Sequence, residues 1–209
     1  MEYIFNMYAG FGMNFGKVTI FILLYVGFYF VILYNLAAEK LLETSRNKKY
    51  IYTRTVRRSR FYLRGMWEQY KSVFFRITIF NLLVWGIDEI CGFTIRSEDK
   101  LWMILLLNYL HIAFTIALLN VFSLIFKVSF VTNCIFAMNI FSVLAAGFYA
   151  QNVQESTWWF KWIPSISALP EFHKGNGSLW INAGIIGVET LVIIVIGSYL
   201  ALRLDVKEV

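Results

Sequence analysis

Long apolar runs alternate with short polar stretches along most of this chain. Runs with few or no charges occupy residues 18–38, 72–95, 101–126, 128–150 and 179–202. Each is close to the roughly 20 residues that a helix needs to cross the hydrocarbon core of a bilayer. A segment in lipid must satisfy its own backbone polar groups, so these spans are expected to be helical. The pattern predicts an all-α fold, a single multi-pass transmembrane helical bundle of about five spans covering residues 1–209.

Three longer segments lie outside these runs. Residues 1–16 are apolar, are interrupted by glycines and are too short to cross, so we expect them at the outer membrane surface. Residues 39–71 form a basic segment on the inner side. Residues 151–178 form an outer segment that holds both prolines, Pro164 and Pro170, and three tryptophans, Trp158, Trp159 and Trp162. Because tryptophan gathers at membrane interfaces, we expect a short interfacial helix or re-entrant turn there.

The distribution of basic residues predicts the orientation. The stretch 39–76 holds 11 of the 19 lysines and arginines. Basic residues in short loops stay in the cytoplasm. With five spans and a cytoplasmic C-terminus, 14 of the 19 basic residues fall inside and 5 outside. The opposite orientation would reverse this ratio.

The second half of the basic segment has a helical period of apolar residues. We expect an amphipathic helix that lies at the membrane surface and leads into the span at 72–95. Its apolar stripe would contain Val56, Leu63, Met66, Trp67, Tyr70 and Phe74. The basic segment has three interpretations: it binds lipid head groups, it docks an ATPase, or it only fixes orientation. Its length argues against orientation alone.

The composition excludes several functional classes. The chain is 59% hydrophobic and 15% charged, and its net charge of +6 lies beside predicted spans, which points to lipid and not to nucleic acid. It has no HExxH, GxSxG, CxxC or phosphate-binding loop, so we expect no enzyme activity, metal or cofactor in this chain. The isolated cysteines Cys91 and Cys134 are expected to be buried and inert.

Four ionisable residues within or near the spans are candidate contacts along a substrate pathway. Glu189 lies in the middle of the last span, where it either contacts a solute or hydrogen-bonds neighbouring helices. His111 is either a proton or substrate contact or a satisfied buried imidazole. Asp88 and Glu89 either line an outer vestibule or are solvated at the interface. The small pair Ala183 and Gly187 permits close helix contact.

The order of these segments resembles that of permease subunits of type-2 ABC exporters, over roughly residues 20–209. The resemblance rests on the basic stretch IYTRTVRRSRFYLRG, a following hairpin of two spans, the outer stretch WFKWIPSISALP and the C-terminal stretch GSYLALRLDV. It is strongest to short permeases for export of, and immunity to, bacteriocins or peptide antibiotics. Members of this class normally have six spans, which implies that a five-span chain pairs with a second permease.

This resemblance implies an ATP-driven exporter of a peptide or of an amphipathic, lipid-like solute in the bacterial plasma membrane. A separate cytoplasmic ATP-binding subunit, which holds the ATP and Mg, would dock on residues 40–66. The coupling residues would be Arg54, Arg57, Arg58, Arg60 and Arg64. The outer gate would contain Trp158, Trp159, Trp162, Pro164 and Pro170. The chain would dimerise with itself or with a second permease.

A second resemblance concerns the first half of the chain. The stretches IFNMYAGFGMNFGK and RGMWEQYKSVFFRITIFNLL are similar to those of YesL-like small membrane proteins. This resemblance implies a different function, that of a non-transporting integral membrane regulator or assembly partner without an ATPase subunit.

Overall fold

The described part of the chain is entirely helical. The computed structural model describes residues 38–39, 41–42, 58–90, 98–152, 162–164 and 179–203, and within them there is no strand. Four long helices occur: α4 (Arg58–Ile90), α5 (Glu98–Phe122), α6 (Val128–Asn152) and α8 (Leu179–Arg203). This confirms the all-helical prediction for these residues. The predicted first span at 18–38 and the predicted surface segment at 1–16 lie outside the described residues, save for residue 38.

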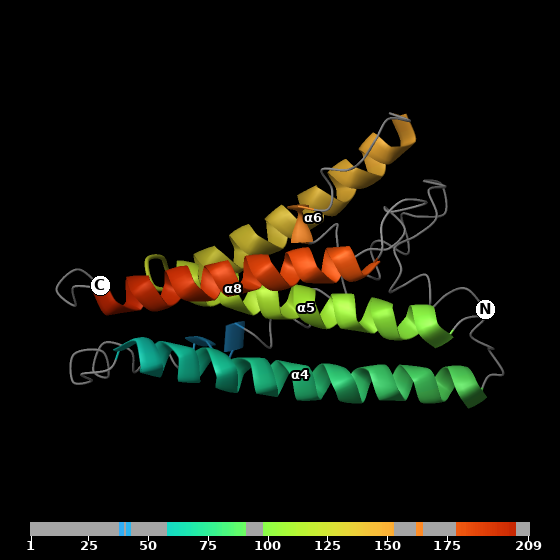
Figure 1. Ribbon diagram of the computed structural model, residues 1–209, viewed down its shortest axis with the longest axis horizontal. Coiled ribbons are helices and arrows are strands. Elements are labelled where there is room, and N and C mark those ends of the chain that lie inside the picture. The colour runs from blue at the N-terminus through green and yellow to red at the C-terminus, as the bar shows by residue number, and fades with distance from the viewer. Residues whose placement is uncertain are drawn as a thin grey trace.

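The helices alternate in direction, with α5 at the centre. In Figure 1, α4 and α6 run in one direction along the long axis while α5 and α8 run in the other. α5 contacts α4, α6 and α8, and α8 also contacts α4. α6 packs on α5 near its start and then diverges from α5 and α8 (Figure 1).

Two of the described helices are long and apolar enough to cross a membrane. The qualifying stretches are Leu105–Phe122 in α5 and Trp180–Arg203 in α8, and α6 adds a shorter apolar stretch, Val128–Ser142. The α5 stretch is mostly buried inside the bundle, whereas most of the α8 stretch is on the surface. α8 thus presents apolar side chains outward along its length, as a helix in contact with lipid does.

The start of α4 is continuous with the rest of the helix. We expected an amphipathic helix at the membrane surface that leads into the span at 72–95, and α4 is one helix of 33 residues, about 50 Å long at 1.5 Å per residue. The stretch around residue 72 contains neither proline nor glycine, so nothing there interrupts the hydrogen-bond ladder. The basic first turns of α4 therefore run along the bundle (Figure 1).

The predicted apolar stripe of α4 is not the face that packs inside the bundle. Leu63, Trp67 and Phe74 are exposed, and the buried residues are Tyr62, Gln69, Val73 and Ile77. The buried face also carries the Gln69 amide, whose Oε1 accepts a hydrogen bond from Asn120 of α5.

Two apolar clusters join α8 to its neighbours. Near the helix starts, Met103 and Leu107 of α5 pack with Ala183 and Ile186 of α8. The other cluster lies near the ends of α5 and α8. It contains Tyr62 of α4, Val121 of α5, Leu124 just after α5 and Ala201 of α8. Because starts meet starts and ends meet ends, α5 and α8 are parallel.

Gly197 permits the close approach at the second cluster. A Cβ atom at position 197 would overlap the Tyr62 hydroxyl and would also meet the Tyr62 ring and Val121. A Cβ at Gly184 or Gly187 would meet nothing within 4 Å. The predicted small pair therefore does not mark one contact, since Ala183 is buried against α5 while Gly187 faces open space.

We expect Gly197→Ala to lower the free energy of unfolding by about 1–3 kcal/mol, because the added methyl overpacks the junction of α4, α5 and α8. Gly184→Ala and Gly187→Ala are matched controls and should be neutral or slightly stabilising, since alanine favours the helix. Unfolding of the purified protein in mild detergent measures all three. The double variant with Tyr62→Ala should lose less than the sum of the two single losses, because the side chain that the added methyl meets is then absent. Equal behaviour of the three glycine variants would contradict the close approach.

Candidate functional site

Among the described residues, eight uncharged or weakly basic polar side chains are buried in the bundle. α5 contributes four of them, which extend from Asn108 to Asn120 over about 18 Å of helix. We call the set the polar core: Gln69, Asn108, His111, Thr115, Asn120, Asn139, Asn182 and Thr190. Buried polar groups within apolar helices are costly unless they are hydrogen-bonded. The hydrogen-bond partners of each side chain therefore decide whether it holds helices together or can still bind a solute.

Amide hydrogen bonds tie α5 to α4 and to α6. The Asn120 Nδ2 group donates to Gln69 Oε1 of α4 and to the Ile116 carbonyl oxygen of its own helix, the latter at 2.8 Å. His111 Nε2 donates to Asn139 Oδ1 of α6 at 3.2 Å, and Asn139 Nδ2 donates to the Ile135 carbonyl oxygen at 2.9 Å. Both amides thus bridge two helices while donating to a backbone carbonyl oxygen of their own helix.

Tyr109 makes a second junction between α5 and α4. Its hydroxyl lies 2.9 Å from Thr78 Oγ1 and accepts a bond from Asn81 Nδ2 at 3.3 Å. Its ring lies 4.6 Å from that of Phe74, which continues through Tyr70 to Trp67 in a row of aromatic contacts along α4. α4 is therefore fixed to α5 at two levels, near Asn120 and near Tyr109.

Among the described residues, two side chains of α8 have buried polar atoms that make no hydrogen bond. Asn182 is fully buried, and neither its Oδ1 nor its Nδ2 hydrogen-bonds any described residue. Glu189 is half-buried, with Oε2 buried and without a hydrogen bond. The residues are seven apart, so they lie two turns apart on one face of α8. A buried polar atom without a partner costs about 1–3 kcal/mol, which makes both groups candidates for a ligand or solute.

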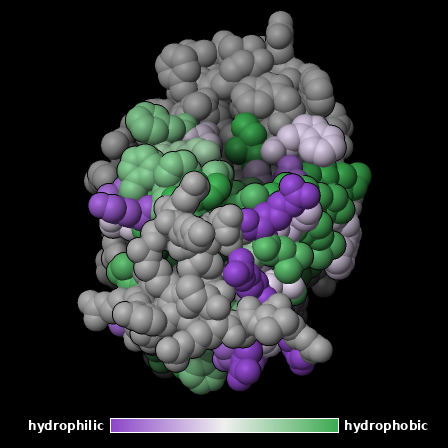
Figure 2. Space-filling model, turned by 90° about the vertical axis from the view of Figure 1, so that its left-hand side faces the viewer, coloured by the Kyte–Doolittle hydropathy of each residue, from purple (hydrophilic) through white to green (hydrophobic). Residues whose placement is uncertain are grey.

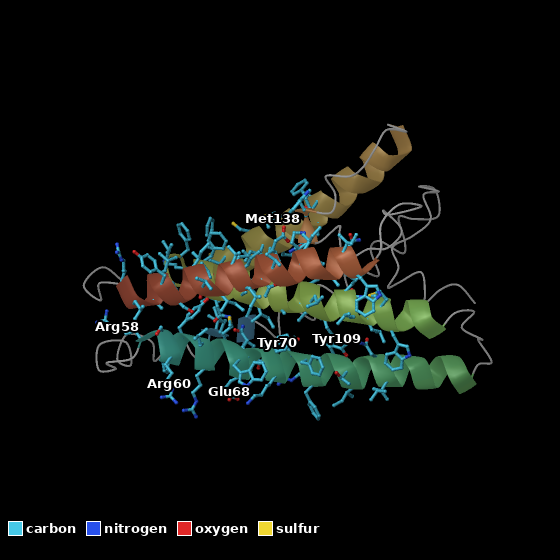
Figure 3. The ribbon with its side chains drawn as sticks, in the orientation of Figure 1. Arg58, Arg60, Glu68, Tyr70, Tyr109 and Met138 are labelled. Atoms are coloured by element: carbon cyan, nitrogen blue, oxygen red, sulfur yellow. The ribbon has the colours of Figure 1, made fainter. Side chains whose placement is uncertain are left out.

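Basic side chains gather at the end of the bundle where α4 begins and α8 ends. Arg58, Arg60 and Arg64 occupy the first turns of α4, Lys127 lies between α5 and α6, and Arg203 ends α8. Figure 2 faces this end and shows hydrophilic side chains among hydrophobic ones. The Arg203 guanidinium lies 4.6 Å from the centre of the Tyr199 ring. In Figure 3, Arg60 and Glu68 point away from the other helices.

The other end is richer in acidic residues. α4 closes with Asp88 and Glu89, and α5 opens with Glu98 and Asp99 followed by Lys100. The structure places Asp88 and Glu89 in the last turn of α4, and their side chains are outside its description. The bundle thus has a basic end and a mixed, acid-rich end.

The remaining predicted site residues are not brought together in the described structure. His111 is 2% exposed and bonds Asn139, as the packing interpretation of this residue requires. Trp162 is exposed and Pro164 half-buried. Arg54, Arg57, Trp158, Trp159 and Pro170 lie outside the described residues.

Several polar residues of the site were missed by sequence reasoning. Gln69, Asn120, Asn139 and Asn182 are uncharged and sit singly within apolar or amphipathic stretches. An amide inside a predicted span was the available signal, because such side chains commonly hydrogen-bond across helices. Attention to ionisable residues alone passed over them.

The structure gives no sign of a metal site among the described residues, where no three His, Cys, Asp or Glu side chains cluster. Cys134 is exposed on α6, so the expectation that it is buried is wrong. The exposed face of an apolar helix accommodates a thiol because cysteine behaves as a small hydrophobic residue.

Comparison with known proteins finds no matching family model, curated protein or solved structure. The resemblances drawn from the sequence therefore stay predictions, and function is inferred from the chain's own residues.

We expect Gln69→Leu and Asn120→Leu each to lower stability by about 1–3 kcal/mol, because each leaves the partner amide buried with one bond fewer. The double variant should lose less than the sum of the single losses, by about 1 kcal/mol, since both orphaned groups are then gone. A double-mutant cycle from unfolding in detergent measures this coupling. Thr78→Val with Asn120→Leu is the control pair and should be additive. Additivity in the first cycle would contradict the bridge.

Asn182→Leu should raise the unfolding temperature, because leucine of similar size replaces an amide that makes no hydrogen bond within an apolar layer. Asn139→Leu is the matched control. It should lower the unfolding temperature, since this amide bridges His111 and the α6 backbone. Thermal unfolding in one detergent checks both variants. A fall for Asn182→Leu as large as that for Asn139→Leu would show that Asn182 has a structural partner.

Proposed function

We propose that the chain is the membrane-spanning permease subunit of an ATP-driven transporter and exports an amphipathic or peptide solute. In this proposal the chain crosses the bacterial plasma membrane about five times, with its C-terminus in the cytoplasm. Support comes from two helices able to cross a membrane, from polar groups inside their bundle and from the basic end. Basic residues mark the cytoplasmic side of membrane proteins.

The single observation that carries the proposal is the continuity of α4. Its first turns hold Arg58, Arg60 and Arg64, and the same rigid helix hydrogen-bonds the polar core at Asn120 and the Tyr109 junction. A push on the basic end would therefore be transmitted to polar contacts between α4 and α5. This is the mechanical connection that a coupling helix needs between an ATPase and a solute pathway.

The other parts of the transporter would come from outside the described residues or from other chains. A cytoplasmic ATP-binding subunit would hold the ATP and Mg and would dock on residues 40–66, including Arg54 and Arg57. A second permease, either another copy or a sister subunit, would complete the pathway. The outer segment with Trp158, Trp159 and Pro170 would gate the exit, together with the exposed Trp162 and with Pro164.

The second candidate is a membrane regulator or assembly partner that moves no solute. The bond between His111 and Asn139 favours it, because a satisfied imidazole holds helices together and offers no free contact to a solute. This candidate predicts that the chain associates with no ATP-binding subunit.

Copurification from the native host separates the two candidates. We expect a tagged chain in mild detergent to bring down an ATP-binding subunit in stoichiometric amount. Reversing Arg58, Arg60 and Arg64 to Glu should abolish this association, because the basic end then repels an acidic dock. The matched control reverses three charges at the opposite end, Glu98→Lys, Asp99→Lys and Lys100→Glu, and should retain the subunit. A chain that purifies alone would overturn the transporter proposal in favour of the regulator.

A further inference from the structure

Glu189 is an acidic side chain near the middle of the most apolar described helix. It is the ninth residue after Trp180, where the apolar stretch Trp180–Arg203 begins. Its carboxylate makes no ion pair and accepts no hydrogen bond from the described residues, and Oε2 is buried. The nearby hydroxyl of Thr190 does not help, because it donates to the Ile186 carbonyl oxygen of its own helix at 2.7 Å. An ionisable residue at such a position is costly and normally has a partner.

The surroundings of Glu189 are apolar on the side that faces outward. Val192 and Ile196 follow it by three and seven residues and so continue the same edge of α8. They are 51% and 47% exposed, which leaves an open apolar strip beside the carboxylate. The described basic residues of α8 and of the α5–α6 turn, Arg203 and Lys127, lie at the end of the bundle.

Charge complementarity identifies the partner that such a strip fits. A carboxylate accepts hydrogen bonds and attracts cations, and the attraction is strong where water is scarce. An inorganic cation would satisfy the charge but would gain nothing from Val192 and Ile196. A neutral apolar molecule would cover the strip and leave the carboxylate without a partner. A molecule with both a positive charge and an apolar body satisfies the two groups together.

We propose that Glu189 binds amphipathic organic cations, with the positive charge at its carboxylate and the apolar body along Val192 and Ile196. The inference deepens the proposed transport function and rests on it, since it names the class of solute. The solute would enter from the lipid side, where the apolar face of α8 is open.

Binding of tetraphenylphosphonium to the purified chain in phosphatidylcholine nanodiscs tests the inference. Equilibrium dialysis of the labelled probe should show saturable binding, and Glu189→Gln should weaken it at least tenfold. Glu68→Gln is the matched control, because Glu68 is an exposed carboxylate paired with Lys71 at 3.1 Å, and it should bind as the unaltered chain does. Lipid partitioning of the probe is the same in all three samples and cancels. Equal binding by Glu189→Gln would overturn the inference.

Two further measurements keep the test independent of folding. Triphenylphosphine oxide, a neutral molecule of similar shape, should not compete with the probe. In the unaltered chain, the probe should protect Glu189 from modification by dicyclohexylcarbodiimide, a reagent for carboxyl groups in apolar surroundings, as read by mass spectrometry. Competition by the neutral molecule, or modification unchanged by the probe, would overturn the inference even if Glu189→Gln failed to fold.

Failure of the two proposals would give different results. Loss of cation binding with an ATP-binding subunit still copurifying would reject only the solute class. Cation binding by a chain that copurifies with no such subunit would reject ATP-driven transport and leave the site on α8.

Discussion

Close packing between α8 and α5 determines the arrangement of the described helices. α8 approaches α5 at Ala183 and Ile186 near one end and at Gly197 and Ala201 near the other. Because small residues mark both contacts, the helix backbones can come close at these two places and dispersion contacts accumulate there. α4 is then positioned by Tyr62, which fills the space that Gly197 leaves. Only α6, which has no comparable contact with α8, diverges from the bundle.

Because of this packing, each polar side chain in the interior needs a hydrogen-bond partner. Several find one locally, as Thr190 and Ser198 do by donating to the carbonyl oxygen four residues earlier in their own helix. Others find one across helices, as Asn120 does with Gln69. The amides of the polar core therefore fix α4 and α6 to α5 without introducing charge. On α8, Asn182 and Oε2 of Glu189 make no hydrogen bond of either kind with the described residues.

Hydropathy along the sequence predicted where helices lie but not which of their faces contact one another. The uninterrupted apolar runs predicted helices at α5, α6 and α8, and α6 begins at Val128 as expected. Hydropathy did not identify the buried face of α4, because apolar side chains such as Trp67 and Phe75 are exposed while the amide of Gln69 is buried. Nor did it locate the junction at Gly197, since a glycine in a predicted span has the same appearance whether a neighbour approaches it or not.

Glu189 and His111 show which features of the site could be predicted from the sequence and which required the structure. Glu189 was recognisable because a carboxylate within an apolar run is unusual, but only the structure shows that it lacks a partner while His111 has one. The two residues therefore have different roles although the sequence presents them alike. His111 holds α5 to α6 in a satisfied bond, and such a bond resists movement. Glu189 lies on the open edge of α8, where a cation can approach without displacing any packed side chain, so binding there requires no rearrangement of the polar core. A transport step would require such a rearrangement. The continuous helix α4 extends from the basic end to the side-chain hydrogen bonds that would then have to change.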